Sequence, residues 1–395
     1  MNRPTKAGCK TSERSSALPG NPDGGGVDAC DRDNGGPNGG GVLSLLDGAT
    51  SHKPLIDPEL EAQREIARDA SKSTQDRLEA YENIIDSAVG DTILLRARNT
   101  EREVGLRQIY LKFEGGNPSG TQKDRIAFAQ AMDAMRRGFD TVTLATCGNY
   151  GAAMAIAASI AGLRCIIYIP RTYHTKRIKE MEQYGAQIVR VEGDYEAAVT
   201  LSSAVADAEG YYDANPGGEN SVLQIKAYGE IAFEIYDELR DAPAAVAVPV
   251  SNGTTLAGIY KGFLSLYRRG KTSRMPRIVA ASSFRKNPII EAYLSNSPSC
   301  CDLKPEKVRE TPMNEPLVNW HSADGNLALD AVRVTNGWAS HASDKNMLAF
   351  QRLIRDCEGL NVLPASTVGL IALLDRLKKE QLPGDRYVVV LTGRK

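Results

Sequence analysis

The stretch KFEGGNPSGTQKDR, residues 112–125, decides the fold of this chain. It joins the end of an apolar strand, predicted at 109–113, to the first turn of a helix through an Asn-Pro-Ser-Gly turn. Lys123 therefore stands at a helix start, where the helix dipole, partial burial and the neighbouring Arg125 all disfavour a second positive charge. A lysine amine that has lost its proton can form a Schiff base with an aldehyde. On this segment alone, an ordinary surface helix start is an equally good interpretation.

Two later strand-to-helix turns add to this lysine. Residues 146–151 (TCGNYG) follow an apolar strand predicted at 141–145 and open an Ala-rich helix. Residues 248–258 (VPVSNGTTLAG) follow a strand predicted at 244–248, and nearly every residue before the helix is small or carries a hydroxyl. Free N–H donors at a helix N-terminus and hydroxyl groups suit a phosphate. Together the three segments predict an amine, a polar contact and a phosphate cradle in one α/β chain.

These segments resemble, in order and spacing, those of the fold type II pyridoxal-phosphate enzymes (the tryptophan synthase beta-like fold). They are most similar to threonine synthase and its cysteate-synthase-like relatives. The family's Asn-Pro-Thr-Gly-Ser-Phe-Lys-Asp-Arg resembles residues 117–125, its Ser/Thr-Gly-Asn-Thr resembles 147–150, and its Val-Pro-x-Gly-Asn-x-Gly-Asn resembles 248–255. Its Glu-Gly-x-x-x-x-Pro-Ala-Ser matches residues 358–366, and its last strand with a Thr-Gly turn resembles 388–393.

The resemblance covers the chain from about Tyr81 to the C-terminus and implies pyridoxal 5'-phosphate (PLP) as the cofactor. Lys123 would carry the internal aldimine, Asn149 would hydrogen-bond the ring hydroxyl, and Thr392 would face the pyridine nitrogen. The cofactor phosphate would be held by Ser251, Asn252, Gly253, Thr254 and Thr255. The substrate would be contacted by the loop residues Thr146, Cys147, Gly148 and Tyr150. Metal ligands are not expected.

The hydroxyl of Thr392 bears on the type of reaction, independently of the resemblance. It cannot keep the ring nitrogen protonated as a carboxylate would, so elimination or replacement at the β or γ carbon is favoured over transamination. The sequence thus predicts a PLP-dependent amino-acid lyase or synthase. The alternatives are threonine synthase proper, which makes threonine from O-phosphohomoserine, or a PLP-binding regulator without catalysis. An unrelated nucleotide-binding protein is disfavoured because the chain lacks Gly-x-Gly-x-x-Gly and Gly-Lys-Ser/Thr loops.

Three departures from the family pattern bear on the substrate. Cys147 replaces a hydroxyl residue, and Tyr150 is much larger than the usual Thr and should crowd the region of the substrate carboxylate. Residues 215–219 (NPGGE) lack the arginine of the Asn-Pro-x-Arg segment that threonine synthases tend to carry. We therefore expect a substrate other than O-phosphohomoserine. It would be a phosphoserine-type amino acid undergoing β-replacement, or a thioether or hydroxy amino acid undergoing β-elimination. Lys112 and Arg125 could meet an anionic substrate group or be ion-paired.

Composition limits the possible partners and surroundings. A net charge of −1 over 395 residues gives no electrostatic signature for nucleic acid or an anionic membrane. The seven cysteines are odd in number and form no CxxC pair, which argues against a disulfide framework or a zinc site. The N-terminus has no apolar leader segment. We expect a cytoplasmic homodimer acting on a small amino acid.

The domain organisation follows from composition and periodicity. Residues 1–41 are rich in Gly, Asn, Asp, Ser and Pro and predict a disordered tail. Residues 42–80 predict a helical N-terminal arm, and 81–395 the catalytic domain. Apolar runs at 109–113, 141–145, 165–169, 188–191, 244–248, 278–281 and 387–391 alternate with helical stretches. This alternation predicts parallel sheets covered by helices. By family analogy the fold comprises two open parallel-sheet subdomains, the smaller at about 125–239, with the site in the cleft between them.

Overall fold

The computed structural model describes residues 58–146, 148–173, 177–382 and 384–395. The predicted tail, the first part of the predicted arm (42–57) and Cys147 lie outside the described residues. All helices and strands below belong to one compact unit, Leu55–Lys395.

The larger sheet has six strands in the order β1-β2-β10-β7-β8-β9. Only β1 is antiparallel to its neighbour; the other pairings are parallel. The central strands β7 and β10 are buried along their whole length, which fits their continuous apolar sequences. The strand bounds are β1 Leu94–Arg96, β2 Ile109–Phe113, β7 Ala245–Pro249, β8 Arg277–Ser283, β9 Trp338–Ala342 and β10 Tyr387–Leu391.

The smaller sheet has four parallel strands in the order β5-β4-β3-β6. Its central strand β3 is completely buried. The strand bounds are β3 Thr141–Ala145, β4 Arg164–Pro170, β5 Gln187–Val191 and β6 Tyr212–Asp213.

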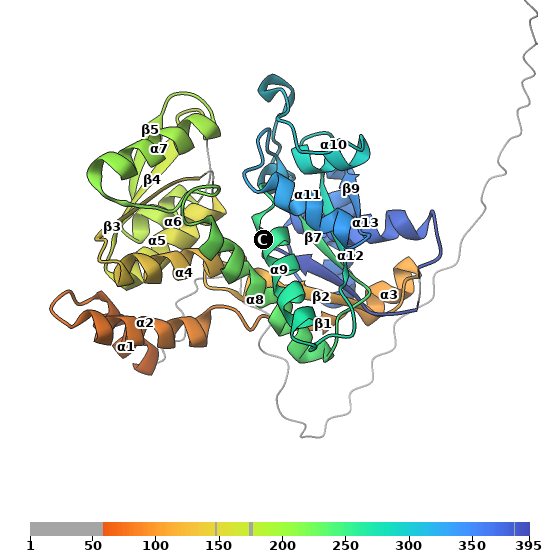
Figure 1. Cartoon of the computed structure of the whole chain (residues 1–395), viewed down its shortest axis with the longest axis horizontal. Helices are drawn as coiled ribbons and strands as arrows, with labels where there is room; N and C mark the ends of the chain where they lie inside the picture. The colour runs from red at the N-terminus through yellow and green to blue at the C-terminus, as the bar shows by residue number, and fades with distance from the viewer. Residues whose placement is uncertain (1–57, 147, 174–176, 383) are drawn as a thin grey trace, which may run out of the picture. The chain divides into compact units, whose positions relative to one another are not determined.

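Helices cover both sheets (Figure 1). Around the smaller sheet lie α4 Lys123–Arg136, α5 Asn149–Ala161, α6 Ile178–Gln183 and α7 Tyr195–Glu209. The larger sheet is covered by α3 Arg98–Val104, α10 Pro288–Leu294, α11 Gly325–Val334, α12 Asp344–Glu358 and α13 Val368–Leu377.

Two long helices, α8 Ser221–Leu239 and α9 Thr254–Arg268, lie side by side between the sheets (Figure 1). They approach closely because glycines face one another: a Cβ at Gly262 would lie 2.4 Å from the carbonyl oxygen of Gly229. A larger residue at either position would push the helices apart.

Two helices precede the sheets, α1 Pro58–Arg68 and α2 Thr74–Ala88. They pack on α5, where the Tyr81 hydroxyl donates to the carbonyl oxygen of Ala157 at 3.0 Å and Arg77 donates to that of Ala161 at 2.7 Å. The helical pattern in this part of the chain thus continues past residue 80.

The observed architecture confirms the predicted α/β class with two mainly parallel sheets covered by helices. All seven predicted strands are present, with bounds shifted by at most two residues. The seven predicted strands do not include β1 and β6, which are three and two residues long, or β9, whose sequence WASHA has no clear apolar alternation. Among the described helices, none has the length and apolar character that a membrane crossing needs.

Candidate active site

A cleft of about 530 Å³ opens at the carboxyl ends of the parallel strands β3, β7 and β10. This is where ligands bind in open parallel sheets. Every predicted site residue that the structure describes lines it: Lys123, Thr146, Gly148, Asn149, Tyr150, Ser251, Asn252, Gly253, Thr254, Thr255 and Thr392. The fold therefore brings together segments that are up to 269 residues apart in the chain.

Lys123 is the first residue of α4, and its amine lies among aromatic rings. Its Nζ is 5.7 Å from the ring centre of Tyr150 and 6.0 Å from that of Tyr228. Burial lowers the pKa of Lys123 to about 8, against the opposing field of Glu315. A useful fraction of the amine is therefore neutral and nucleophilic near neutral pH.

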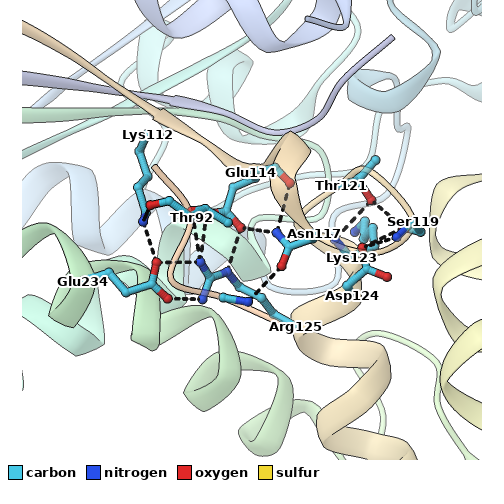
Figure 2. A network of polar contacts seen from close by, with 11 residues as sticks. Thr92, Lys112, Glu114, Asn117, Ser119, Thr121, Lys123, Asp124, Arg125 and Glu234 are labelled. Atoms are coloured by element: carbon cyan, nitrogen blue, oxygen red, sulfur yellow. Dashed lines mark hydrogen bonds and ion pairs between the residues drawn. The ribbon is translucent and has the colours of Figure 1, made fainter. Parts of the chain in front are cut away.

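Arg125 does not depress the pKa of Lys123, contrary to the sequence-based argument, because its charge is already neutralised. Its guanidinium forms bidentate pairs with two carboxylates (Figure 2). Nε and Nη2 donate to Glu114 at 2.6 and 2.9 Å, and Nη1 and Nη2 donate to Glu234 at 2.6 and 2.8 Å. The side chain is 4% exposed, so this network is fully structural.

Lys112 belongs to the same network. Its Nζ lies 2.5 Å from Glu234 Oε2 and also donates to the carbonyl oxygen of Thr92. Two cations and two carboxylates thus neutralise one another in the interior. Lys112 and Arg125 are therefore ion-paired, and neither is among the described residues that line the cleft.

The turn before Lys123 is fixed by four hydrogen bonds, which involve the side chains of Asn117 and Asp124 (Figure 2). The amide of Asn117 donates to Glu114 Oε2 at 3.1 Å, and its oxygen accepts from the N–H of Gly90 at 3.0 Å. The carboxylate of Asp124 accepts from the N–H and hydroxyl of Ser119 at 2.9 and 2.8 Å. Lys123 is therefore held on a rigid loop.

Asn149, the first residue of α5, is oriented by an arginine that the sequence does not single out. Arg177 donates from Nη1 to Asn149 Oδ1 at 2.8 Å and from Nη2 to the carbonyl oxygen of Ser119 at 2.9 Å. Because the amide oxygen is occupied, the amide NH₂ of Asn149 is the group available to donate. Arg177 also connects the asparagine loop to the lysine loop.

Tyr150 and Thr146 shape the asparagine loop from within. The Tyr150 hydroxyl donates to the carbonyl oxygen of Ala214 at 2.7 Å and accepts from Gln130. The Thr146 hydroxyl accepts from the N–H groups of Gly148 and Gly151 at 3.2 and 3.3 Å. The polar end of Tyr150 is thus tied to the protein interior, and its ring forms the cleft wall near Lys123.

The loop before α9 has the features of a phosphate cradle. Gly253 has a φ of +93°, and a Cβ there would lie 2.9 Å from both the carbonyl oxygen of Asp324 and the Cβ of Ala328. The glycine is therefore required by the backbone and by packing against α11. The Thr254 hydroxyl donates to Asp324 at 2.5 Å, which leaves its N–H and the hydroxyls of Ser251 and Thr255 as candidate donors to an anion.

Thr392 follows β10 directly and lines the cleft. Its hydroxyl is 3.0 Å from that of Ser366, and its carbonyl oxygen accepts from the N–H of Gln122 at 3.0 Å. The polar group that follows β10 is therefore the pair of hydroxyls of Thr392 and Ser366.

Residues 85–393 match the family of pyridoxal-phosphate dependent enzymes. The chain belongs to this family. Its cofactor is therefore PLP, and the cleft fits it: a buried lysine amine with a lowered pKa suits the aldehyde, and the start of α9 suits the phosphate.

The similar sequences and structures agree with this assignment. Threonine synthase of Methanocaldococcus jannaschii is 28% identical over 311 residues, which cover 78% of this chain and 75% of that protein. Threonine synthase of Mycobacterium tuberculosis is also 28% identical and covers 77% of this chain and 81% of that protein. The structure of maize serine racemase superposes with a TM-score of 0.67 at 19% identity, covering 80% of this chain and 92% of that one. This last likeness shows the fold.

Proposed function

We propose that this enzyme is a lyase or synthase of the threonine-synthase-like group, which eliminates or replaces a group at the β or γ carbon of an amino acid. The observation that carries the proposal is the hydroxyl pair Thr392–Ser366 at the end of β10. A hydroxyl does not hold the ring nitrogen of the cofactor protonated, and this weaker electron sink favours loss of a leaving group over transamination.

The residues of the chain would divide the work as follows. PLP, when bound, supplies the electron sink for the bond broken at the substrate Cα. Lys123 would hold the cofactor aldehyde, and its free amine would be the base that takes the Cα proton of the substrate. Asn149, whose amide is oriented by Arg177, would donate to the ring hydroxyl, and residues 251–255 would hold the phosphate.

The rigid surroundings of Lys123 support the role of base. Two sets of contacts position the segment that carries the amine. They are the ion-paired network around Arg125 and the hydrogen bonds between Asp124 and Ser119, and neither uses a group that a ligand in the cleft would need. A base acts efficiently when its pKa lies near the working pH, and the pKa of Lys123 is about 8 because of burial.

The first test is the covalent bond at Lys123. The purified protein should be yellow with PLP, and borohydride should bleach it while fixing the cofactor to the peptide that contains Lys123. Lys123→Ala should lose the bond and turnover but keep some cofactor through residues 251–255. Lys179→Ala, which removes an exposed lysine on α6, is the matched control and should remain yellow. A protein that stays colourless with added PLP would refute the proposal.

The second test concerns the substrate. The relatives at 28% identity favour threonine synthase, whereas the segment 215–219 lacks the arginine that threonine synthases tend to carry. In this structure Asn215 is used internally, since its amide oxygen accepts from the N–H of Ala145 at 2.7 Å. We therefore expect O-phosphohomoserine to be a poor substrate. A kcat/KM of about 10⁴ M⁻¹s⁻¹ or more for it, with threonine as product, would make threonine synthase the correct assignment.

A further inference from the structure

The cleft contains a carboxyl group that the sequence does not single out. Glu315 begins the short helix η3 Glu315–Leu317 and lines the cleft together with Lys123. The hydroxyl of Tyr173, which follows β4 of the smaller sheet, donates to Glu315 Oε1 at 2.7 Å. Within the described part of the chain, Oε2 accepts no hydrogen bond. One oxygen is thus fixed by the opposite wall, and the other is available to a ligand.

The surroundings of Glu315 bring it into the titration range of an acid catalyst. Burial raises its pKa to about 6, although the hydrogen bond from Tyr173 acts in the opposite direction. The charged groups that act on it are Glu310, Arg177 and Lys123. Burial also lowers the pKa of Lys123 to about 8. Two groups of opposite type, each displaced toward neutral pH in one cleft, form an acid–base pair.

The charges that line the cleft disfavour a phosphate ester. In the part of the chain that the structure describes, the charged residues that line the cleft are Lys123, Asp194, Arg309, Glu310 and Glu315. Asp194 is used internally, since it accepts from the N–H of Ala197 at 3.0 Å and from the indole of Trp320 at 3.1 Å. The Lys123 amine would be bonded to the cofactor aldehyde and would not be available to pair with an anionic group of the substrate. Among the described lining residues, Glu310, Glu315 and the exposed Arg309 then remain to face the substrate, and this excess of carboxyl groups is unfavourable for a dianion.

On the basis of the proposed function, we propose that Glu315 is a second catalytic residue, a general acid that protonates the leaving group of an unphosphorylated β-hydroxy or β-thioether amino acid. The Lys123 amine takes the Cα proton, and the electron pair left at Cα forms a Cα–Cβ double bond. The Cβ–O or Cβ–S bond breaks, and its electron pair remains on the heteroatom. The proton on Glu315 Oε2 passes to that heteroatom, so that water or a thiol leaves. The Glu315 carboxylate then regains a proton from solvent.

The test compares a leaving group that needs a proton with one that does not. The hydroxyl of L-serine is a poor leaving group unless an acid protonates it, so that it leaves as water. The chloride of β-chloro-L-alanine leaves without protonation. With the holoenzyme, Glu315→Gln should lower kcat for L-serine by at least about 100-fold and change kcat for β-chloro-L-alanine by less than about 3-fold. Glu306→Gln is the matched control, because it removes an exposed carboxyl group nine residues earlier in the chain that is not among the described residues lining the cleft, and it should leave both rates close to wild type.

The pH dependence adds a signature that a structural role would not produce. In the wild type, the ratio of kcat for L-serine to kcat for β-chloro-L-alanine should fall as pH rises above about 6, because the acid form of Glu315 is lost. The contribution of Lys123 cancels in this ratio. In Glu315→Gln the ratio should not vary with pH. Equal losses with both substrates in this variant would overturn the acid role.

The substrate class is tested by binding, without turnover. Titrations followed by the absorbance of the bound cofactor should give at least about 10-fold tighter binding of L-serine or S-methyl-L-cysteine than of O-phospho-L-serine or O-phospho-L-homoserine. Tighter binding of the phosphate esters, lost in Arg309→Ala, would overturn the inference and leave the proposed function intact. Failure of the wild type to release chloride from β-chloro-L-alanine would instead refute the proposed function.

Discussion

Glu234→Gln should destabilise the protein by removing one carboxylate from the buried network around Arg125. The glutamate side chain is 13% exposed and contacts both Arg125 and Lys112. Burial alone would raise the pKa of Glu234, but these two cations lower it from 4.5 to about 2. That change corresponds to about 3 kcal/mol of stability at neutral pH. Breaking a buried pair by removing one partner costs about 3–5 kcal/mol, which agrees.

The assay is urea and thermal unfolding of the cofactor-free protein at pH 7. For a unit of this length, about 3 kcal/mol corresponds to a fall in Tm of roughly 4 °C. Glu230→Gln, one turn earlier on α8 at an exposed position, is the matched control and should change stability by less than about 0.5 kcal/mol.

The difference in stability between wild type and Glu234→Gln should depend on pH in a defined direction. Because the folded-state pKa of Glu234 lies below the unfolded value, its contribution is complete well above pH 4.5 and is lost as pH falls toward 2. The gap between wild type and Glu234→Gln should therefore narrow from about 3 kcal/mol at pH 7 to about 2 kcal/mol at pH 3.5. Equal stability of the two proteins at pH 7, or a gap that widens in acid, would refute the reasoning.

Three further outcomes are expected. Gly253→Ala should raise the dissociation constant of PLP, measured by absorbance titration, at least about 10-fold, because the new Cβ would lie 2.9 Å from a backbone oxygen. Gly185→Ala is the control. Gly185 has a similar φ of +80° but open space around the Cβ, so this variant should leave the dissociation constant unchanged. The rate at which the apoenzyme bonds PLP should rise with pH and level off above about 8, since burial lowers the pKa of Lys123 to that value; a flat stopped-flow profile would contradict it. Tyr150→Phe should lower the free energy of unfolding, measured in urea, by about 1–2 kcal/mol, because the hydrogen bond to the carbonyl oxygen of Ala214 is lost. The KM should stay unchanged. A higher KM at unchanged stability would instead indicate that the Tyr150 hydroxyl contacts the substrate.

The sequence by itself predicts the seven main strands and the three loops that meet in the cleft. These features are local: an apolar run, a turn residue and a helix start lie within about fifteen residues of one another, and their backbone preferences are set by neighbours in the chain. The lysine at the start of α4 and the glycine of the loop before α9 are found in this way.

Only the tertiary structure decides what each charged side chain does. Arg125 and Lys112 are cations beside the lysine segment in sequence, yet they are neutralised by Glu234, which is 109 residues after Arg125. No sequence motif marks Arg177 or Glu315. Arg177, the residue before α6, reaches the site through Asn149, and η3 brings Glu315 to the cleft. Charge pairing and burial depend on contacts between distant segments, and the same contacts set the pKa values that determine which groups can react.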